Sequence, residues 1–472
     1  MNPAICQLRA EALECLAQNI LPFWLDQMQD NEHGGWYGRM DGHGTLHPQA
    51  EKGAILNARI LWSFSAASRV LAKEGGRYQD LRERCLQAAA RTKDYFLRHF
   101  LDREQGGVYW SVDYLGRPLD TKKQFYAIGF AIYGLSEYAR ATGDDEALQA
   151  ALVLFEDVER HAWDSVHGGY IEACTRDWRP ISDMRLSDKD ENYPKSQNTH
   201  LHIIEPYTNL LRALKERSTA AAAAVPAIAT TDTAATAVVA SAVRRLLSLV
   251  PATATADTAA TAVVAGAVRR LLSLFAERIL NPATHHLDLF FQMDWSRMST
   301  TESYGHDIEC SWLLHEAALV LGDADVLHQL EPVVQQVAVA SERGLLPNGA
   351  MIHESGDPDL HWWVQAEAVV GFLNIYQHFG DEAALARALA TWQFIKEHLI
   401  DRERGEWYWS LRADGCVRPV HGDASCLKDG GDASRETSYS VNLDEDHAGF
   451  WKCPYHNSRM CLEILERFPT GG

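Results

Sequence analysis

The chain lacks the long apolar run that a membrane-spanning helix needs. None of its windows approaches about 20 uninterrupted apolar residues. Residues 1–26 read as an amphipathic helix, without the basic and apolar segments of a secretion signal. We therefore expect a soluble, cytoplasmic protein without a membrane partner, present as a monomer or a weak dimer.

Positive charge is also scarce. The 44 lysines and arginines are outnumbered by 64 aspartates and glutamates, which gives a formal net charge of -20 at pH 7. A nucleic-acid-binding surface needs a basic patch, so this balance argues against a nucleic-acid partner. It places no restriction on a sugar ligand.

Paired cysteines and nucleotide-binding motifs are missing. The nine cysteines are scattered and include no CxxC pair, which excludes a disulfide framework and a thiolate zinc site and fits reduced thiols. The chain contains no GxGxxG or Walker motif for a nucleotide, and no GxSxG motif for a serine nucleophile.

What the chain does have is a repeated turn. An Asp or Asn, three further residues and a Gly-rich, aromatic run recur about every 60 to 70 residues, with one doubled gap. The copies begin at Asp30, Asp102, Asp164, Asn281 and Asp401, with a weaker one near Gly344. The Gly pair predicts a turn, and the alternating aromatic residues predict a short strand or hairpin arm.

Between these copies the apolar residues recur with the helical period, as in 52–72 and 122–141. A unit of one helical hairpin and one short strand cannot bury its own apolar faces. Six such units therefore predict an all-α protein, an (α/α)6 barrel with short aromatic strands at one mouth. Residues 1–472 would form this single catalytic domain.

The doubled gap contains a tandem duplication. Residues 231–250 are repeated nearly letter for letter at 256–275, in a stretch rich in Ala, Thr and Val. Removing about 217–273 restores the spacing of the other units. We interpret 217–273 as an insertion without chemistry, which either forms extra helix between units or is poorly ordered.

Polar residues on otherwise apolar helices predict a pocket at one mouth. Asn198, His202 and Glu205 are spaced i, i+4 and i+7, so they share one helical face. His200 points to the opposite side, so the two histidines cannot chelate a metal as a helical pair. We expect His202 to have a functional role.

Histidines also follow two predicted helix starts. His306 and Glu309 are one turn apart, so the carboxylate could fix the tautomer of the imidazole and raise its basicity. Trp312 continues the same side. His456 lies in a first turn at Pro454, where the positive helix end disfavours an imidazolium. The alternatives are a buried ion pair for the first histidine and a capping role for the second.

Arginine and tryptophan complete the expected pocket. Arg59 would face the barrel interior, which is costly unless the guanidinium meets an anion or a developing negative charge. Trp362 and Trp363 are adjacent, and Trp451 precedes His456 by five residues. These rings could stack against sugar units.

Two neutral histidines that face one cavity suit the removal of a proton from one face of a carbon and its return to the other. Removal from C2 of a ring-opened sugar gives an enediolate, which Arg59 would stabilise. Return to C2 inverts that carbon, whereas return to C1 gives a ketose. The His–Glu pairs lie on separate helices without compact ligand spacing, so we expect no metal ligands.

Five segments together resemble the cellobiose 2-epimerases of the N-acylglucosamine 2-epimerase superfamily. They are SYGHDIECSWLL, NTHLHIIEPYTNLLRAL, HLDLFFQMDW, HWWVQAEAVVGF and FWKCPYHNSR. The likeness covers nearly the whole chain outside 217–273. It implies an (α/α)6 barrel without a cofactor and a catalytic pair of His306 and His456, with Glu309 supporting His306.

The same resemblance implies reversible epimerisation at C2 of the reducing-end glucose of β-1,4-linked disaccharides. It assigns the reducing-end sugar and its enediolate to His202, Asn198, Arg59 and Tyr126, and stacking to Trp363 and Trp451. We add to the sugar-binding set Glu205, Trp312 and Trp362.

Three alternatives remain open. A monosaccharide aldose–ketose isomerase or an N-acylglucosamine 2-epimerase would share the histidines, although the adjacent tryptophans favour a disaccharide. A glycoside hydrolase needs two carboxyl groups across the scissile bond, for which Asp288, Asp294 and Glu367 are candidates. A non-catalytic scaffold would need none of the histidines at helix starts.

Overall fold

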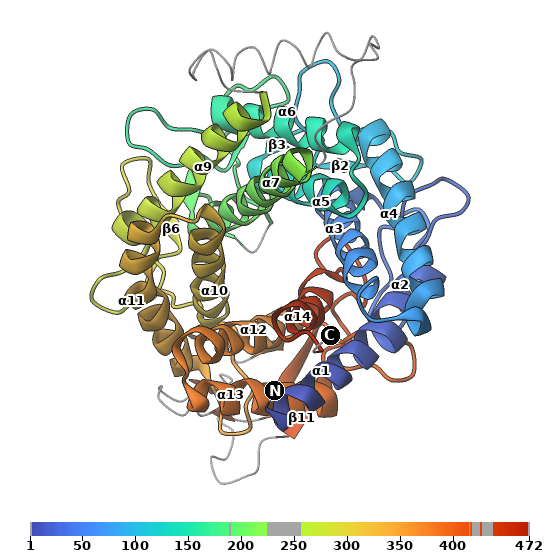
Figure 1. The fold of residues 1–472 in the computed structure, drawn as a ribbon, viewed down its shortest axis with the longest axis vertical. Helices are drawn as coiled ribbons and strands as arrows, with labels where there is room; N and C mark the ends of the chain where they lie inside the picture. Colours follow the sequence, from blue (N-terminus) through green and yellow to red (C-terminus); the bar gives the residue numbers. More distant parts are fainter. Residues whose placement is uncertain are drawn as a thin grey trace.

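The computed structural model describes residues 2–187, 190–223, 256–357, 359–414, 416–417, 425–426 and 438–470. Its long helices form two concentric layers (Figure 1). The inner layer contains α3 (Ala54–Leu71), α5 (Phe125–Thr142), α7 (Gln197–Ala223), α10 (Tyr304–Leu321), α12 (Trp362–Phe379) and α14 (Tyr455–Arg467). Each inner helix packs against the next, and α14 packs against α3, so the ring closes.

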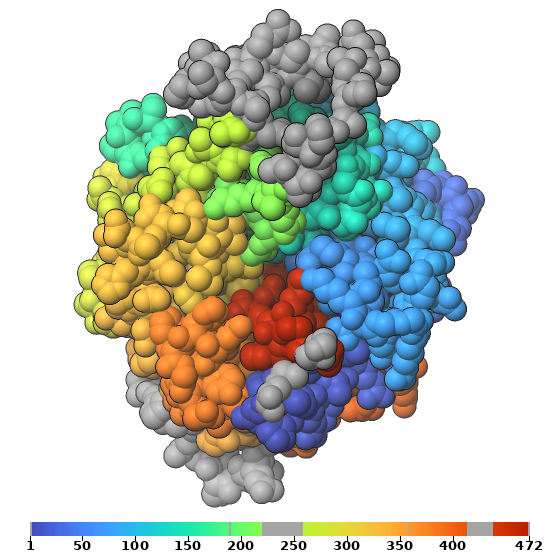
Figure 2. All heavy atoms as spheres, in the orientation of Figure 1, coloured from blue at the N-terminus to red at the C-terminus, as the bar shows by residue number. Residues whose placement is uncertain are grey.

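The outer layer covers the inner one, helix by helix. Behind the first five inner helices lie α4 (Gln79–His99), α6 (Asp145–His161), α9 (Ala256–Leu274), α11 (Ala324–Ser341) and α13 (Glu382–Phe394). Behind α14 lies α1 (Pro3–Cys15), which continues through η1 (Leu16–Ile20) into α2 (Leu21–Gln27). The N-terminal and C-terminal segments lie side by side (Figure 2). The expected (α/α)6 barrel is confirmed, and its sixth hairpin joins the two ends of the chain.

Short antiparallel strands gather the N-termini of the inner helices at one mouth. Each pair joins the residues before an inner helix to those after its outer partner: β1 (Lys52–Gly53) with β2 (Ser111–Val112), β3 (Lys123–Gln124) with β4 (Ala173–Cys174), and β5 (Lys195–Ser196) with β6 (Phe290–Phe291). A larger sheet contains β7 (Leu360–His361), β8 (Ser410–Asp414) and β11 (Ser438–Val441), and β9 (Cys416–Val417) pairs with β10 (Ser425–Cys426). Short helical turns lie at η2 (Gly76–Tyr78), η3 (Phe275–Ile279), η4 (Glu342–Gly344) and η5 (Ile395–Leu399).

In three of its copies the repeated turn is built around a buried ion pair. One carboxylate oxygen of Asp30 accepts hydrogen bonds from the backbone of Glu32 and His33, and the other lies 2.7 Å from the Nζ atom of Lys52. Asp102 with Lys123, and Asp164 with Lys195, repeat this arrangement. Each lysine begins the strand that leads into an inner helix, so the ion pair fastens the turn to the next hairpin.

The second copy of the tandem duplication is part of the barrel. It forms α9, which packs against α7 and α10 and buries Val264, Val268 and Leu271. The interpretation of 217–273 as an addition is therefore wrong for α9, because that range contains both copies and its removal would leave α7 without an outer helix. The first copy lies outside the described residues. Thr258–Ile279 is long and apolar enough to cross a membrane, and its packing in the ring accounts for that composition.

Candidate active site

The order of residues along the inner helices sets the depth of each polar side chain, because every inner helix starts at the same mouth. Close to the helix starts lie Tyr126 on α5, His306 on α10 and His456 on α14. About one turn deeper lie Arg59 on α3, His202 on α7, Glu309 on α10 and Glu367 on α12. The barrel therefore brings together side chains from all six inner helices.

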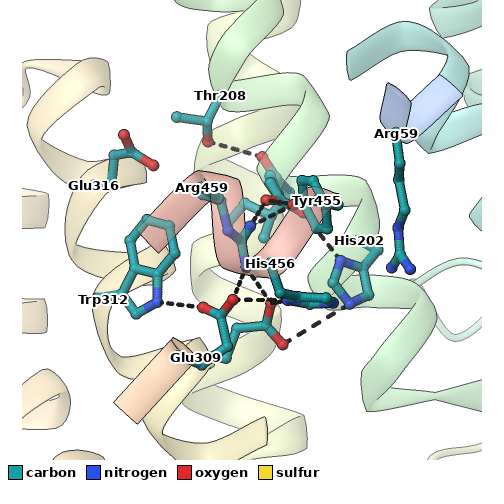
Figure 3. A network of polar contacts seen from close by, with 12 residues as sticks. Arg59, His202, Thr208, Glu309, Trp312, Glu316, Tyr455, His456 and Arg459 are labelled. Atoms are coloured by element: carbon teal, nitrogen blue, oxygen red, sulfur yellow. Dashed lines mark hydrogen bonds and ion pairs between the residues drawn. The ribbon is translucent and has the colours of Figure 1, made fainter. Parts of the chain in front are cut away.

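Arg459 of α14 is the centre of the polar network (Figure 3). Its Nη2 atom lies 2.6 Å from Oε1 of Glu309 and 2.6 Å from Oε1 of Glu367. Its Nη1 atom bonds to Glu205 and to the hydroxyl of Tyr455. Burial opposes the guanidinium charge, but the carboxylates outweigh it and raise the pKa of Arg459 well above its ordinary value. Three buried carboxyl groups thus share one guanidinium.

This excess of carboxyl groups acts on Glu309. Burial and the nearby Glu367 raise the pKa of Glu309 well above its ordinary value, so its protonated form is favoured more than in a free glutamate. Its Oε2 atom has no hydrogen-bond partner among the described residues and lies 4.0 Å from Nε2 of His202. This oxygen can therefore accept a hydrogen bond from a bound ligand or, when protonated, donate one.

His456 is held by Glu367. Its Nδ1 atom lies 2.7 Å from Oε1 of Glu367, and Trp312 donates a 3.0 Å hydrogen bond from Nε1 to the other oxygen. The carboxylate favours a proton on Nδ1 and leaves a lone pair on Nε2. Burial, with Arg59 and Arg459, lowers the pKa of His456 well below its ordinary value. Burial, and not only the helix start, disfavours the imidazolium form of this ring.

Trp312 is not a sugar-stacking wall. Its ring is fully buried and packs under the guanidinium of Arg459, with Cζ 4.8 Å from the ring centroid. The predicted sugar-binding role of Trp312 is therefore wrong, because its ring is not exposed to a ligand. Its hydrogen bond orients Glu367, and through Glu367 it orients His456.

His306 takes its hydrogen bond from Ser303 and not from Glu309. The Nδ1 atom of His306 lies 2.7 Å from the hydroxyl of Ser303, the N-cap residue of α10. The predicted pairing of His306 with Glu309 is thus wrong, because Arg459 binds the carboxyl group of Glu309 while Ser303 bonds to the imidazole. His306 is partly accessible, yet the enclosing walls desolvate it, and this burial lowers its pKa well below the ordinary value.

Removal of the Ser303 hydroxyl is expected to reduce turnover about tenfold to a hundredfold, since the imidazole of His306 loses the hydrogen bond at its Nδ1 atom. The variants to compare are Ser303→Ala and Ser303→Thr, the second of which keeps a hydroxyl. Steady-state kinetics should show a loss in kcat for alanine with partial rescue by threonine. Equal losses in both variants would indicate a packing effect and contradict the hydrogen-bond role.

His202 is anchored to Glu205, as the shared helical face predicts. Its Nδ1 atom lies 3.0 Å from Oε2 of Glu205, and its ring centroid lies 4.9 Å from that of Tyr126. The predicted sugar-binding role of Glu205 is wrong in this arrangement, because Arg459 and Tyr455 bind its other oxygen. Glu205 instead orients His202 through the hydrogen bond at Nδ1.

His200 and Asn198 lie away from this network. His200 accepts a 2.9 Å hydrogen bond from the backbone of Tyr170, which confirms that it points to the opposite side of α7. Asn198 lies at the start of α7 and lines a small cavity with Glu172 and Tyr193. The carbonyl oxygen of its side chain has no hydrogen-bond partner among the described residues. Of the three residues expected to share one helical face, His202 and Glu205 are in contact. Asn198 lines the small cavity instead.

Glu172, which also lines that cavity, should make stability depend on pH. Burial raises its pKa to about 7 from an ordinary value of 4.5. Its stabilising contribution is complete below pH 4.5 and is lost as pH rises through 7, because the ionised form is disfavoured only when folded. The variant Glu172→Gln should therefore raise Tm at about pH 8 and change it little at about pH 5. Thermal unfolding checks this, and equal shifts at both pH values would contradict it.

Arg59 faces the barrel interior, as predicted. Its Nη2 atom donates a 2.8 Å hydrogen bond to the hydroxyl of Tyr126, and its guanidinium lies 4.1 Å from the ring centroid of Phe130. Burial opposes the charge, but Tyr126 contributes to raising the pKa of Arg59 above its ordinary value. The Nε atom lacks a hydrogen-bond partner among the described residues. A buried cation with an unused donor is suited to an oxyanion.

Trp363 and Trp451 are partly exposed at the mouth, whereas Trp362 is buried. The ring centroid of Trp363 lies 4.9 Å from that of His306 and 5.6 Å from that of His456. Trp451 lies 6.0 Å from Tyr126. Trp362 is buried against Trp409 instead. The prediction of a two-ring platform is wrong, because consecutive residues of a helix point about 100° apart.

Known proteins resemble this chain over most of its length. The sequence pattern of the N-acylglucosamine 2-epimerase family matches residues 17–208 and 254–424, so it includes α9. A cellobiose 2-epimerase of Bacteroides fragilis is 48% identical over 464 residues, which is 97% of this chain and 98% of that protein. The solved cellobiose 2-epimerase of Bacillus thermoamylovorans B4167 has a TM-score of 0.77 and 33% identity over 98% of this chain and 100% of its own.

A more distant structure, a D-mannose isomerase, has a TM-score of 0.70 at 17% identity over 99% of this chain and 100% of its own, and shares the fold alone. The family pattern, in contrast, spans most of the chain, and the Bacteroides fragilis relative is similar over nearly all of it. The chain therefore belongs to the N-acylglucosamine 2-epimerase family.

Proposed function

We propose that this protein is a cellobiose 2-epimerase, which interconverts glucose and mannose at the reducing end of a β-1,4-linked disaccharide. The observation that carries the proposal is the pair of histidines, His306 and His456, whose rings both lie beside Trp363 at one mouth. The 48% identity to a cellobiose 2-epimerase along nearly the whole chain supports this substrate class.

In the proposed reaction one imidazole takes the C2 proton of the ring-opened sugar through Nε2. The electron pair of the broken C–H bond passes toward the carbonyl oxygen and gives an enediolate. The second imidazole enters the step protonated and gives its proton to the opposite face of C2, which inverts that carbon. Arg59 bonds to Tyr126, and its charge acts on His202. A sugar bound beside these residues would place its enediolate oxygen near the guanidinium of Arg59, which would stabilise the negative charge.

The two histidines are held by different groups. The carboxylate of Glu367 stabilises a positive charge on His456, whereas the hydroxyl of Ser303 can donate to or accept from Nδ1 of His306. The unpartnered oxygen of Glu309 would form a hydrogen bond with a sugar hydroxyl. Trp363 and Trp451 would cover the sugar faces.

The geometry does not favour glycoside hydrolysis. Asp294 is exposed in a turn, and Asp288 forms an ion pair with Arg297 at 2.6 Å. Glu367 is already bonded to His456. None of these carboxyl groups faces another across an open space, as hydrolysis requires.

The test is incubation of the purified protein with cellobiose in D2O, without added metal or nucleotide, followed by NMR. The proposal expects glucosyl-mannose that carries deuterium at C2. Release of glucose would indicate hydrolysis. If cellobiose remains unchanged while mannose, glucose or N-acetylglucosamine reacts, the protein is a monosaccharide enzyme of the same superfamily.

A further inference from the structure

A second cluster of titratable side chains lies at the mouth, outside the network centred on Arg459. His353, Asp357 and His361 follow one another at intervals of four residues between α11 and α12. The Nδ1 atom of His353 lies 3.4 Å from Oδ2 of Asp357, and Nε2 of His361 lies 3.8 Å from the same oxygen. One atom from each of the three residues lies within 4.8 Å of the other two.

We propose that these three residues, here called the rim triad, bind a divalent transition-metal ion such as Zn²⁺. Two imidazoles and one carboxylate form a ligand set that Zn²⁺ accepts, whereas Ca²⁺ and Mg²⁺ prefer oxygen ligands. Tetrahedral bonds of about 2.1 Å place neighbouring ligand atoms about 3.4 Å apart. The observed distances of 3.4 and 3.8 Å are close to this separation, so small side-chain rotations suffice.

The rim triad is partly enclosed and well anchored. The side chains of His353, Asp357 and His361 are 18, 36 and 17% exposed, which leaves an entry path for an ion.

Two backbone positions hold the histidines near each other. His361 is the N-cap residue of α12, and the carbonyl oxygen of His353 accepts a 3.3 Å hydrogen bond from the backbone of Gly305 at the start of α10. The two imidazole rings lie 4.6 Å apart between centroids. A bound ion would tie the turn after α11 to the start of α12, beside Trp363, whose ring lies 5.4 Å from that of His353.

A second group with metal-ligand spacing does not support the same inference. Glu309, Glu367 and His456 also lie within 4.8 Å of one another. However, Arg459 lies 2.6 Å from both carboxyl groups and already supplies the positive charge. A metal ion there would have to displace a buried guanidinium, so the rim triad is the site that a cation can enter.

The test is a titration of the EDTA-treated and dialysed protein with Zn²⁺, in competition with a chromogenic zinc indicator and without sugar. The unaltered chain is expected to bind one equivalent more than His361→Ala and Asp357→Asn, or to bind it at least about tenfold more tightly. The matched control is His47→Ala, which removes the histidine of an exposed pair with Asp41 at 3.0 Å and should leave the zinc site intact.

Thermal unfolding gives a second readout. Zn²⁺ should raise the Tm of the unaltered chain and of His47→Ala more than that of His361→Ala, because an ion that binds the folded state stabilises it. Identical zinc stoichiometry and affinity in the unaltered chain and His361→Ala would overturn the proposal. Because no sugar is present, failure here leaves the proposed epimerase activity untouched.

Discussion

Replacement of His306 or His456 with asparagine is expected to stop epimerisation of cellobiose, with rates about 10³-fold or more below those of the unaltered chain. Asparagine keeps much of the shape of the imidazole but cannot carry a proton at neutral pH. Inversion needs one group on each face of C2, so loss of either histidine is sufficient. The measurement is the appearance of glucosyl-mannose by NMR, and His47→Asn serves as the exposed-histidine control.

Deuterium exchange separates the roles of the two histidines. In D2O, the variant that keeps the histidine facing the C2 proton of cellobiose should still exchange that proton without inverting C2. The other variant should show neither exchange nor inversion. With glucosyl-mannose as the substrate the two variants should exchange roles, since its C2 proton lies on the opposite face. Inversion by either single variant at more than a tenth of the normal rate would contradict the two-base mechanism.

The barrel could be predicted because its evidence lies in local patterns. The repeated turn beginning at Asp30 marks each hairpin, and the helical period between copies gives the inner and outer helices. The lysines that pair with these aspartates, such as Lys52, were visible only as residues before a helix, and their buried partner needs the folded structure. The bounds of the insertion were wrong because a regular spacing was restored only by removing both copies, and spacing alone does not reveal that the second copy is the outer helix of its hairpin.

The site could be predicted in its residues and less well in its contacts. His306, His456 and Arg59 could be predicted because burying a polar side chain in an apolar helix costs free energy, which a functional role can explain. Their partners were missed because contacts between distant helices leave no spacing signal: Arg459 bonds to Glu309, 150 residues away along the chain. The only local signals were an arginine one turn after His456 and a glutamate inside the apolar α12.

Replacement of Arg459 with methionine is expected to destabilise the fold by about 3–5 kcal/mol, the cost of leaving a buried ionic partner unpaired. Methionine fills similar volume but leaves Glu205 and Glu367 without their guanidinium. Activity should fall as well, because Glu367 orients His456. Denaturant unfolding of the variant gives the loss of stability, and Arg84→Met, which breaks an exposed pair with Asp26, should cost about 1 kcal/mol or less.

The dependence of the stability loss of Arg459→Met on pH distinguishes an electrostatic role of Arg459 from a packing role. Without Arg459 the buried carboxyl groups would have raised pKa values, so they favour the protonated form in the folded state. Their stabilising contribution is then largest at low pH and is lost as pH rises. The deficit of Arg459→Met should therefore shrink at about pH 5 and grow at about pH 8. A deficit that is the same at both pH values would mean that Arg459 acts by filling space between α10, α12 and α14, and not by neutralising Glu205, Glu309 and Glu367.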